Sequence, residues 1–333
     1  MTGTAAAGRG TSRNGATRIV TVTPNPAIDM TYTVHGITEG ASHRVPTPIS
    51  RAGGKGLNVA RVVHQVGHPV LAIAPTGGAA GQTLAAELWT SGVPHTLVSV
   101  AAETRRSIAL VDTVAGETSI FNEEGQALLP DDWRSLTAAV VNAVRGDDGE
   151  APAAVLVGSG SLPPDAPADF YPSLVKLAHD AGIPAIIDTS GPGIITAAQA
   201  GADVLKPNHH ELAEATGESS VEAAALSLIA MGARTVLVSA GADGMLAFDH
   251  AAPGGYWSAS LPGPLSGNPT GAGDAGVAAA AVALAEGITE PREILRRATA
   301  WSAAAVLMPA AGEISPRYQE LEEQLIVTWK ETR

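Results

Sequence analysis

The feature that most constrains the fold is a regular alternation of short apolar segments with amphipathic segments after Pro130. The pattern predicts helices over 131–144, 170–181, 194–200 and 221–231, and strands over 153–157, 184–188, 203–205 and 235–239. Such alternation is typical of βαβ units, in which parallel strands share one sheet that is covered by helices on both faces. We therefore expect an α/β fold with a mostly parallel central sheet.

The rest of the chain adds elements around this core. We expect strands over 19–22 and 70–74 with a helix between them, a hairpin over 245–261, and helices over 271–285, 291–307 and 317–330. Polar alternating segments, drawn from about 30–52 and 105–122, suit a small second sheet with one solvated face. Residues 18–333 then form one domain, and residues 1–17, with neither acids nor an apolar segment, are expected to be a disordered tail.

Composition excludes several classes of function. The chain has 20 Lys and Arg against 33 Asp and Glu, a net charge of −13, and no basic run, so nucleic acid is an unexpected partner. It has no cysteine, which excludes disulfides and thiolate metal sites and fits a cytoplasmic protein. The longest apolar stretch, 275–285, is shorter than the ~20 residues that span a bilayer, so no membrane association is expected.

The sequence Gly271-Ala272-Gly273-Asp274 precedes an alanine-rich helix. Glycines let a backbone approach a ligand closely, and the free NH groups at a helix start bind anions. Asp274 could merely cap the helix, but a cap does not need the glycines. A dinucleotide fingerprint is rejected because prolines, instead of a strand, precede the motif. The motif favours a phosphate-binding turn.

A second glycine cluster, Gly53-Gly54-Lys55-Gly56, also leads into a helix but lacks the Ser or Thr of a Walker A loop. Its alternative interpretation is a flexible turn with a solvated lysine. The sequence from Asn208 to Glu211 has the spacing of a capping box, yet Glu211 could also hold Mg²⁺, which prefers oxygen ligands. The adjacent histidines, 209 and 210, lack the spacing of a zinc site.

Polar clusters follow several of the expected strands, at 23–29, 158–164, 188–191, 206–211 and 239–244. Ligands of open parallel sheets bind at the carboxyl ends of the strands. We therefore expect these clusters to meet at one site.

Together with Glu103-Thr104-Arg105, these motifs occur in an order that resembles the PfkB family of carbohydrate kinases in the ribokinase superfamily, specifically its 1-phosphofructokinase and tagatose-6-phosphate kinase branch. The resemblance runs from about residue 19 to residue 311. It implies a ribokinase-like α/β/α sandwich with a small β-sheet lid, often used for homodimerisation, and phosphoryl transfer from ATP to a sugar hydroxyl.

The resemblance also implies roles for individual residues. Asp274 would be the general base, with Gly271, Ala272 and Gly273 as the NH anion hole. The substrate-binding set would be Asp29, Gly53, Gly54 and Asn58 for the sugar, with Lys55, Arg105 and Arg44 for its phosphate. ATP would bind Lys206, Asn208, Ser239, Gly241 and Gly244, and Mg²⁺ would be held by Glu211 and Asn208 through water.

Two departures from the family pattern leave the sugar open. The stretch from Gly77 to Gly81 lacks the family's acid, and Ser107 replaces a common Asn. Candidate substrates are fructose 1-phosphate, tagatose 6-phosphate and fructose 6-phosphate. The alternatives are a kinase of an unphosphorylated sugar or nucleoside, and a non-catalytic sensor of sugar phosphate or nucleotide on the same fold.

Overall fold

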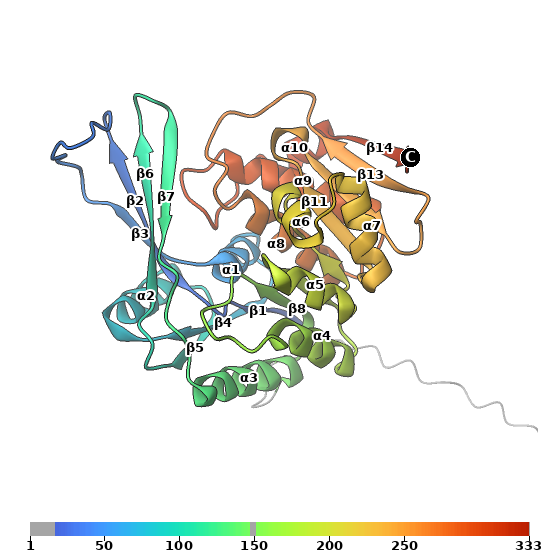
Figure 1. Ribbon diagram of the computed structural model, residues 1–333, viewed down its shortest axis with the longest axis horizontal. Helices are drawn as coiled ribbons and strands as arrows, with labels where there is room; N and C mark the ends of the chain where they lie inside the picture. Colours follow the sequence, from blue (N-terminus) through green and yellow to red (C-terminus); the bar gives the residue numbers. More distant parts are fainter. Residues whose placement is uncertain (1–16, 147–150, 333) are drawn as a thin grey trace, which may run out of the picture.

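The computed structural model describes residues 17–146 and 151–332, and its largest element is a ten-stranded sheet (Figure 1). The strand order is β14-β13-β12-β11-β10-β9-β8-β1-β4-β5, and the strands from β11 to β5 are parallel. The bounds are β1 Arg18–Val22, β4 Val70–Thr76, β5 His95–Ser99, β8 Ala153–Ser159, β9 Ala185–Asp188, β10 Val204–Leu205, β11 Thr235–Ser239, β12 Met245–Asp249, β13 Gly255–Ser260 and β14 Ile326–Glu331.

Helices pack on both faces of this sheet and bury two apolar cores. One core is formed with α1 Lys55–Gln65, α2 Gly78–Ser91, α8 Ala272–Ala285, α9 Pro291–Val306 and α10 Tyr318–Gln324. The other is formed with α3 Pro130–Arg145, α4 Phe170–Asp180, α5 Pro192–Gln199, α6 His209–Thr216 and α7 Val221–Met231. The expected α/β/α sandwich with a mostly parallel sheet is confirmed.

A second sheet of four strands extends away from the sandwich (Figure 1). Its order is β3-β2-β6-β7, with β2 Ala27–Val34, β3 Ile49–Gly53, β6 Arg105–Asp112 and β7 Glu117–Asn122. The strands come from the two regions that the sequence indicated. Ile49, Ile120 and Phe121 are large apolar side chains that this sheet leaves exposed. The expected tail, residues 1–17, lies outside the described residues except for Thr17.

Two expectations about secondary structure were wrong or incomplete. The helix expected over 317–330 ends at Gln324, and β14 follows it as the edge strand beside β13, where Trp329 packs edge-on against Trp257 with ring centroids 5.2 Å apart. A tertiary partner therefore overrides the helical period there. No element was expected between 75 and 106, where α2 and β5 lie. Within the described residues no helix has the length and apolar character to cross a membrane.

Candidate active site

The polar clusters that follow the parallel strands do meet at one end of the main sheet. Two adjoining cavities lie there, of about 640 and 680 Å³. The first, which we call the small-sheet cavity, is bounded by the second sheet, and the other, the α8 cavity, lies at the start of α8. Lys55 and Glu211 line both, so the two cavities are continuous at these side chains.

The turn into α8 presents its backbone and Asp274 to the α8 cavity. Gly271 has φ +84° and is the N-cap of the helix, and a Cβ there would lie 2.8 Å from Ala311. Gly271, Ala272, Gly273 and Asp274 all line the cavity. The carboxylate of Asp274 accepts a hydrogen bond from Asn58 Nδ2 on α1 at 2.8 Å. Asp274 is also the acidic residue in the first turn of α8, so it contacts a second element in addition to its place at the helix start.

The surroundings of Asp274 raise its pKa to about 7. Burial is the largest cause, and the negative charge of Asp188 adds to it. Lys55, the hydrogen bond from Asn58 and Lys206 act in the opposite direction. A carboxyl with such a pKa exchanges a proton near neutral pH, as a general base must.

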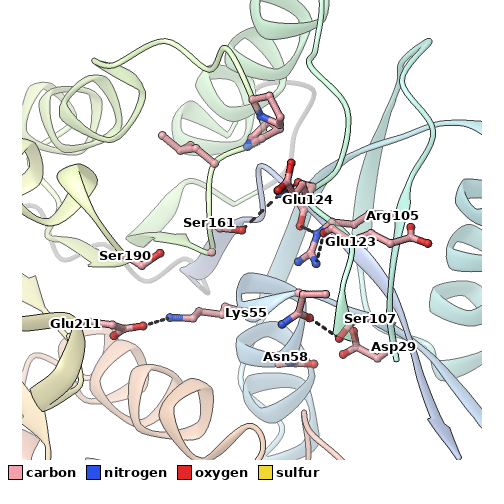
Figure 2. Close-up of a pocket in the computed structure, with 17 residues that line it drawn as sticks. Asp29, Lys55, Asn58, Arg105, Ser107, Glu123, Glu124, Ser161, Ser190 and Glu211 are labelled. Carbon is pink, nitrogen blue, oxygen red and sulfur yellow. Dashed lines mark hydrogen bonds and ion pairs between the residues drawn. The ribbon is translucent and has the colours of Figure 1, made fainter. Parts of the chain in front are cut away.

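Lys55 lies at the junction of the cavities. Its Nζ is 3.1 Å from Asp188 Oδ1. It is also 3.5 Å from Glu211 Oε1, and Figure 2 shows this second pair. Burial alone would lower the pKa of Lys55, but Asp188, Glu211 and Asp274 outweigh it and raise the pKa, so the ammonium stays charged. The alternative of a solvated lysine on a flexible turn is not supported.

Asp188, at the end of β9, was not among the expected site residues. Its side chain is 1% exposed; burial would raise its pKa, but Lys55 and Lys206 hold the pKa below the usual value. The sequence indicated Asp188 only through its position in the polar cluster at 188–191, which follows an expected strand.

Asp29 and Arg105 face the small-sheet cavity from β2 and β6 (Figure 2). Burial raises the pKa of Asp29 to about 6, although Arg105 and Arg61 oppose the shift. Gly53 contacts the Asp29 carboxylate so closely that a Cβ would lie 2.0 Å from Oδ2. Gly54 and Asn58 also line this cavity.

Arg105 is held by two backbone carbonyls. Its Nε donates to Asn25 O at 3.3 Å and one terminal nitrogen donates to Glu123 O at 3.2 Å. Ser107, Asn122 and Ser161, to which the sequence analysis gave no binding role, line the same cavity. Arg44 does not join them: it is exposed in the loop between β2 and β3 and lines neither cavity.

The expected nucleotide residues line the α8 cavity: Lys206, Asn208, Ser239, Gly241 and Gly244. Part of its wall is apolar and was not foreseen, because it comes from separate elements: Met245, Leu261, Leu265, Ala303 and Val306. A cavity with an apolar wall and a glycine-lined polar end suits a nucleotide, because the nucleobase can pack on the wall and the phosphates can bind at the polar end.

The capping box at α6 is confirmed. Asn208 Oδ1 accepts from the NH groups of His210 and Glu211, each at 2.9 Å, and Glu211 Oε2 accepts from the Asn208 NH at 2.9 Å. Both acceptor directions of Asn208 Oδ1 are thus used. Glu211 Oε1 is outside the cap and lies 3.5 Å from Lys55 Nζ. In residues 17–146 and 151–332, no three His, Cys, Asp or Glu side chains form a metal-binding group.

Comparison with known proteins identifies the family. Residues 22–317 match the model of the pfkB family carbohydrate kinases. The chain belongs to this family. The resemblance carried by the motifs is confirmed, and the enzyme class is that of a phosphotransferase with an alcohol group as acceptor.

Several known proteins are similar to the chain along most of its length. The chain is 36% identical over 303 residues to an ATP-dependent 6-phosphofructokinase isozyme 2 of Mycobacterium tuberculosis, covering 89% of this chain and 86% of the relative. It is 34% identical over 307 residues to a 1-phosphofructokinase of Xanthomonas campestris, covering 89% and 93%. The crystal structure of Escherichia coli phosphofructokinase-2 with potassium superimposes with a TM-score of 0.83 at 31% identity, covering 92% and 98%.

Proposed function

We propose that this carbohydrate kinase transfers the terminal phosphoryl group of ATP to a hydroxyl of a sugar phosphate, with Asp274 as the general base. One observation carries the proposal. Asp274, whose pKa is raised to about 7, lines the α8 cavity and is hydrogen-bonded to Asn58, which lines the small-sheet cavity. A base between two cavities can take the proton of a hydroxyl bound in one while phosphate approaches from the other.

The small-sheet cavity suits the sugar phosphate. Asp29, Gly54 and Asn58 supply polar groups for hydroxyls, and Gly53 holds Asp29 by close contact. Lys55 and Arg105 are the Lys and Arg side chains that line this cavity within the described residues, and a guanidinium offers paired donors to a phosphate. The similarity to relatives named for phosphorylated fructose supports an anionic sugar as substrate.

The α8 cavity suits ATP. The NH groups of Gly271 and Gly273 would stabilise the charge on the transferred group, whereas the Ala272 NH donates to Pro269 O at 3.1 Å. Lys206 adds a cation beside Gly273. Asn208, Ser239, Gly241 and Gly244 would line the rest of the nucleotide.

Glu211 would hold Mg²⁺ through water. A single carboxylate fits this ion, which keeps most of its waters and otherwise binds substrate phosphates. When bound, Mg²⁺ neutralises charge on those phosphates. Asn208 is assigned to the nucleotide alone, since its oxygen is used in the helix cap.

The small sheet is proposed as a lid and as the contact with a second copy of the chain. Its exposed Ile49, Ile120 and Phe121 support this, because burying large apolar side chains of a sheet against another surface is energetically favourable. Arg44, in the exposed loop of the same sheet, lines neither cavity, and its role as a phosphate ligand stays a prediction. One structure of the Escherichia coli relative is described as a tetrameric inhibited form, so self-association occurs in a homologous protein.

The test compares substrates in an ADP-release assay with Arg105→Ala and, as a matched control, Arg106→Ala. Arg106 is the next residue, is 41% exposed and does not line the cavity. Removing Arg105 should cost about 2 to 5 kcal/mol in kcat/KM for a sugar phosphate, as for one member of a desolvated charge pair, and little for the free sugar. The control should change neither.

Other outcomes select the alternatives. A parent protein that prefers the unphosphorylated sugar or a nucleoside, or equal slowing of both substrates by Arg105→Ala, contradicts a sugar-phosphate substrate. Binding of sugar phosphate and ATP without ADP release favours a sensor.

A further inference from the structure

The segment from Ala310 to Ile314 connects parts of the site that are distant in sequence. Ala311 contacts Gly271, at the start of the turn from Gly271 to Asp274, which we call the anion turn. The next residue, Gly312, lies against Asn58, since a Cβ there would be 3.2 Å from Asn58 Oδ1. This segment therefore touches both the turn that carries Asp274 and the amide that holds its carboxylate.

The segment is fixed to α1 at its far end. Gln65 Nε2 donates to Ile314 O at 2.7 Å, and Ile314 N donates to Gln65 Oε1 at 2.9 Å. Two reciprocal hydrogen bonds leave the backbone little freedom to rotate. The segment is thus a rigid support behind the anion turn.

Arg51 joins the small sheet to this support. One terminal nitrogen of its guanidinium lies 2.6 Å from Glu313 Oε1, and the other donates to Ala311 O at 3.4 Å. Arg51 is on β3, directly opposite Asp29 in the antiparallel pair of β2 and β3. Its side chain therefore connects the part of the sheet that carries Asp29 with the loop on which Gly271 rests.

A second contact holds β3 on its other side. Ala52 N donates to Glu87 Oε2 at 3.1 Å, and the same carboxylate pairs with Arg61. The loss of Arg51 would leave this anchor to α2 in place. Removal of Arg51 would thus free the sheet from the loop at 311–313 without detaching β3 from the sandwich.

We propose that Arg51, acting through Glu313 and Ala311, is a positioning residue that holds the small sheet at a fixed position relative to the anion turn. The inference rests on the proposed function, in which Asp29 binds the sugar and Asp274 takes its proton. Because displacement of a bound reactant by about 1 Å can cost 10²-fold in rate, a loosened sheet would slow transfer. It would also admit water, so ATP hydrolysis would rise relative to sugar phosphorylation.

The experiment uses Arg51→Ala, with Arg296→Ala as the matched control. Arg296 forms a comparable pair with Glu322 at 2.8 Å on α9 and α10, and lines neither cavity. For Arg51→Ala we expect kcat on a sugar phosphate to fall at least ~10-fold and the ratio of ATP hydrolysis to sugar phosphorylation to rise, with KM for ATP within about twofold of the parent. The control should match the parent in all three.

Two further variants separate positioning from folding. Glu313→Gln keeps the size of the side chain and should lower kcat by less than Arg51→Ala does. If Arg51→Ala does not fold, this variant tests the role instead. The double variant Arg51→Glu with Glu313→Arg restores an ion pair in which the two charges are exchanged. Its kcat should be higher than that of Arg51→Glu or of Glu313→Arg alone. Absence of that recovery, or a kcat for Arg51→Ala within about threefold of the parent, overturns the role.

The failure of this inference can be told from failure of the proposed function. A parent protein without kinase activity on any sugar phosphate overturns both. An active parent whose rate is insensitive to Arg51→Ala and Glu313→Gln overturns the positioning role alone.

Discussion

Replacing Asp274 with Asn should harm turnover and stabilise the fold. Asn keeps the shape of the side chain and an oxygen that can accept from Asn58 Nδ2, but it cannot take a proton. The loss of a general base typically costs ~10²- to 10⁴-fold in rate. ATP binding should persist, because the NH groups of the anion turn are unchanged.

The gain in stability follows from the raised pKa. The Asp274 pKa is about 7 in the folded protein, against 3.8 for an aspartate carboxyl in its ordinary surroundings. Below about pH 4 the carboxyl is neutral in both states; between pH 4 and 7 ionisation favours the unfolded state increasingly, and above pH 7 the cost is constant. A difference of roughly 3 units at 1.36 kcal/mol each gives an upper figure of about 4 kcal/mol. Asn removes this cost.

The assay is urea unfolding between pH 5 and pH 8, together with ADP release. The free energy of unfolding of Asp274→Asn should exceed that of the parent by a few kcal/mol at pH 8 and by less at pH 5. Asp180→Asn is the control, since Asp180 is 62% exposed and pairs with Lys176 at the surface. Turnover by Asp274→Asn within about threefold of the parent would refute the role as base, and a pH-independent stability difference would refute the raised pKa.

Two other predictions concern the same site. The parent's kcat/KM should fall about tenfold per pH unit below pH 7, because Asp274 must be ionised to act, and a flat profile from pH 5 to 8 would contradict this. Glu211→Gln should raise the Mg²⁺ concentration for half-maximal activity while keeping the cap bond to the Asn208 NH, whereas the exposed Glu214→Gln should not. Lost thermal stability with unchanged Mg²⁺ dependence would mean that Glu211 serves the helix alone.

Local patterns in the sequence were enough to predict most of the main sheet and its helices, although α2, β5 and β14 were missed. The alternation after Pro130 predicted the parallel sheet and its helices, because hydrophobic period is set by which face of each element is buried. The capping box of Asn208 and Glu211 and the glycine turn into α8 at Gly271 were also predictable, since each depends on residues within a few positions of one another.

The sequence did not determine contacts between distant segments. The hydrogen bond from Asn58 to Asp274 joins residues 216 positions apart, and the ion pairs of Lys55 with Asp188 and of Arg51 with Glu313 also cross between elements. The end of the chain behaves in the same way: residues from Ile326 to Glu331 form a strand because the edge of β13 and the ring of Trp257 are there to receive them. Such pairings depend on the order of strands in the sheet, which brings their partners together only after the chain has folded.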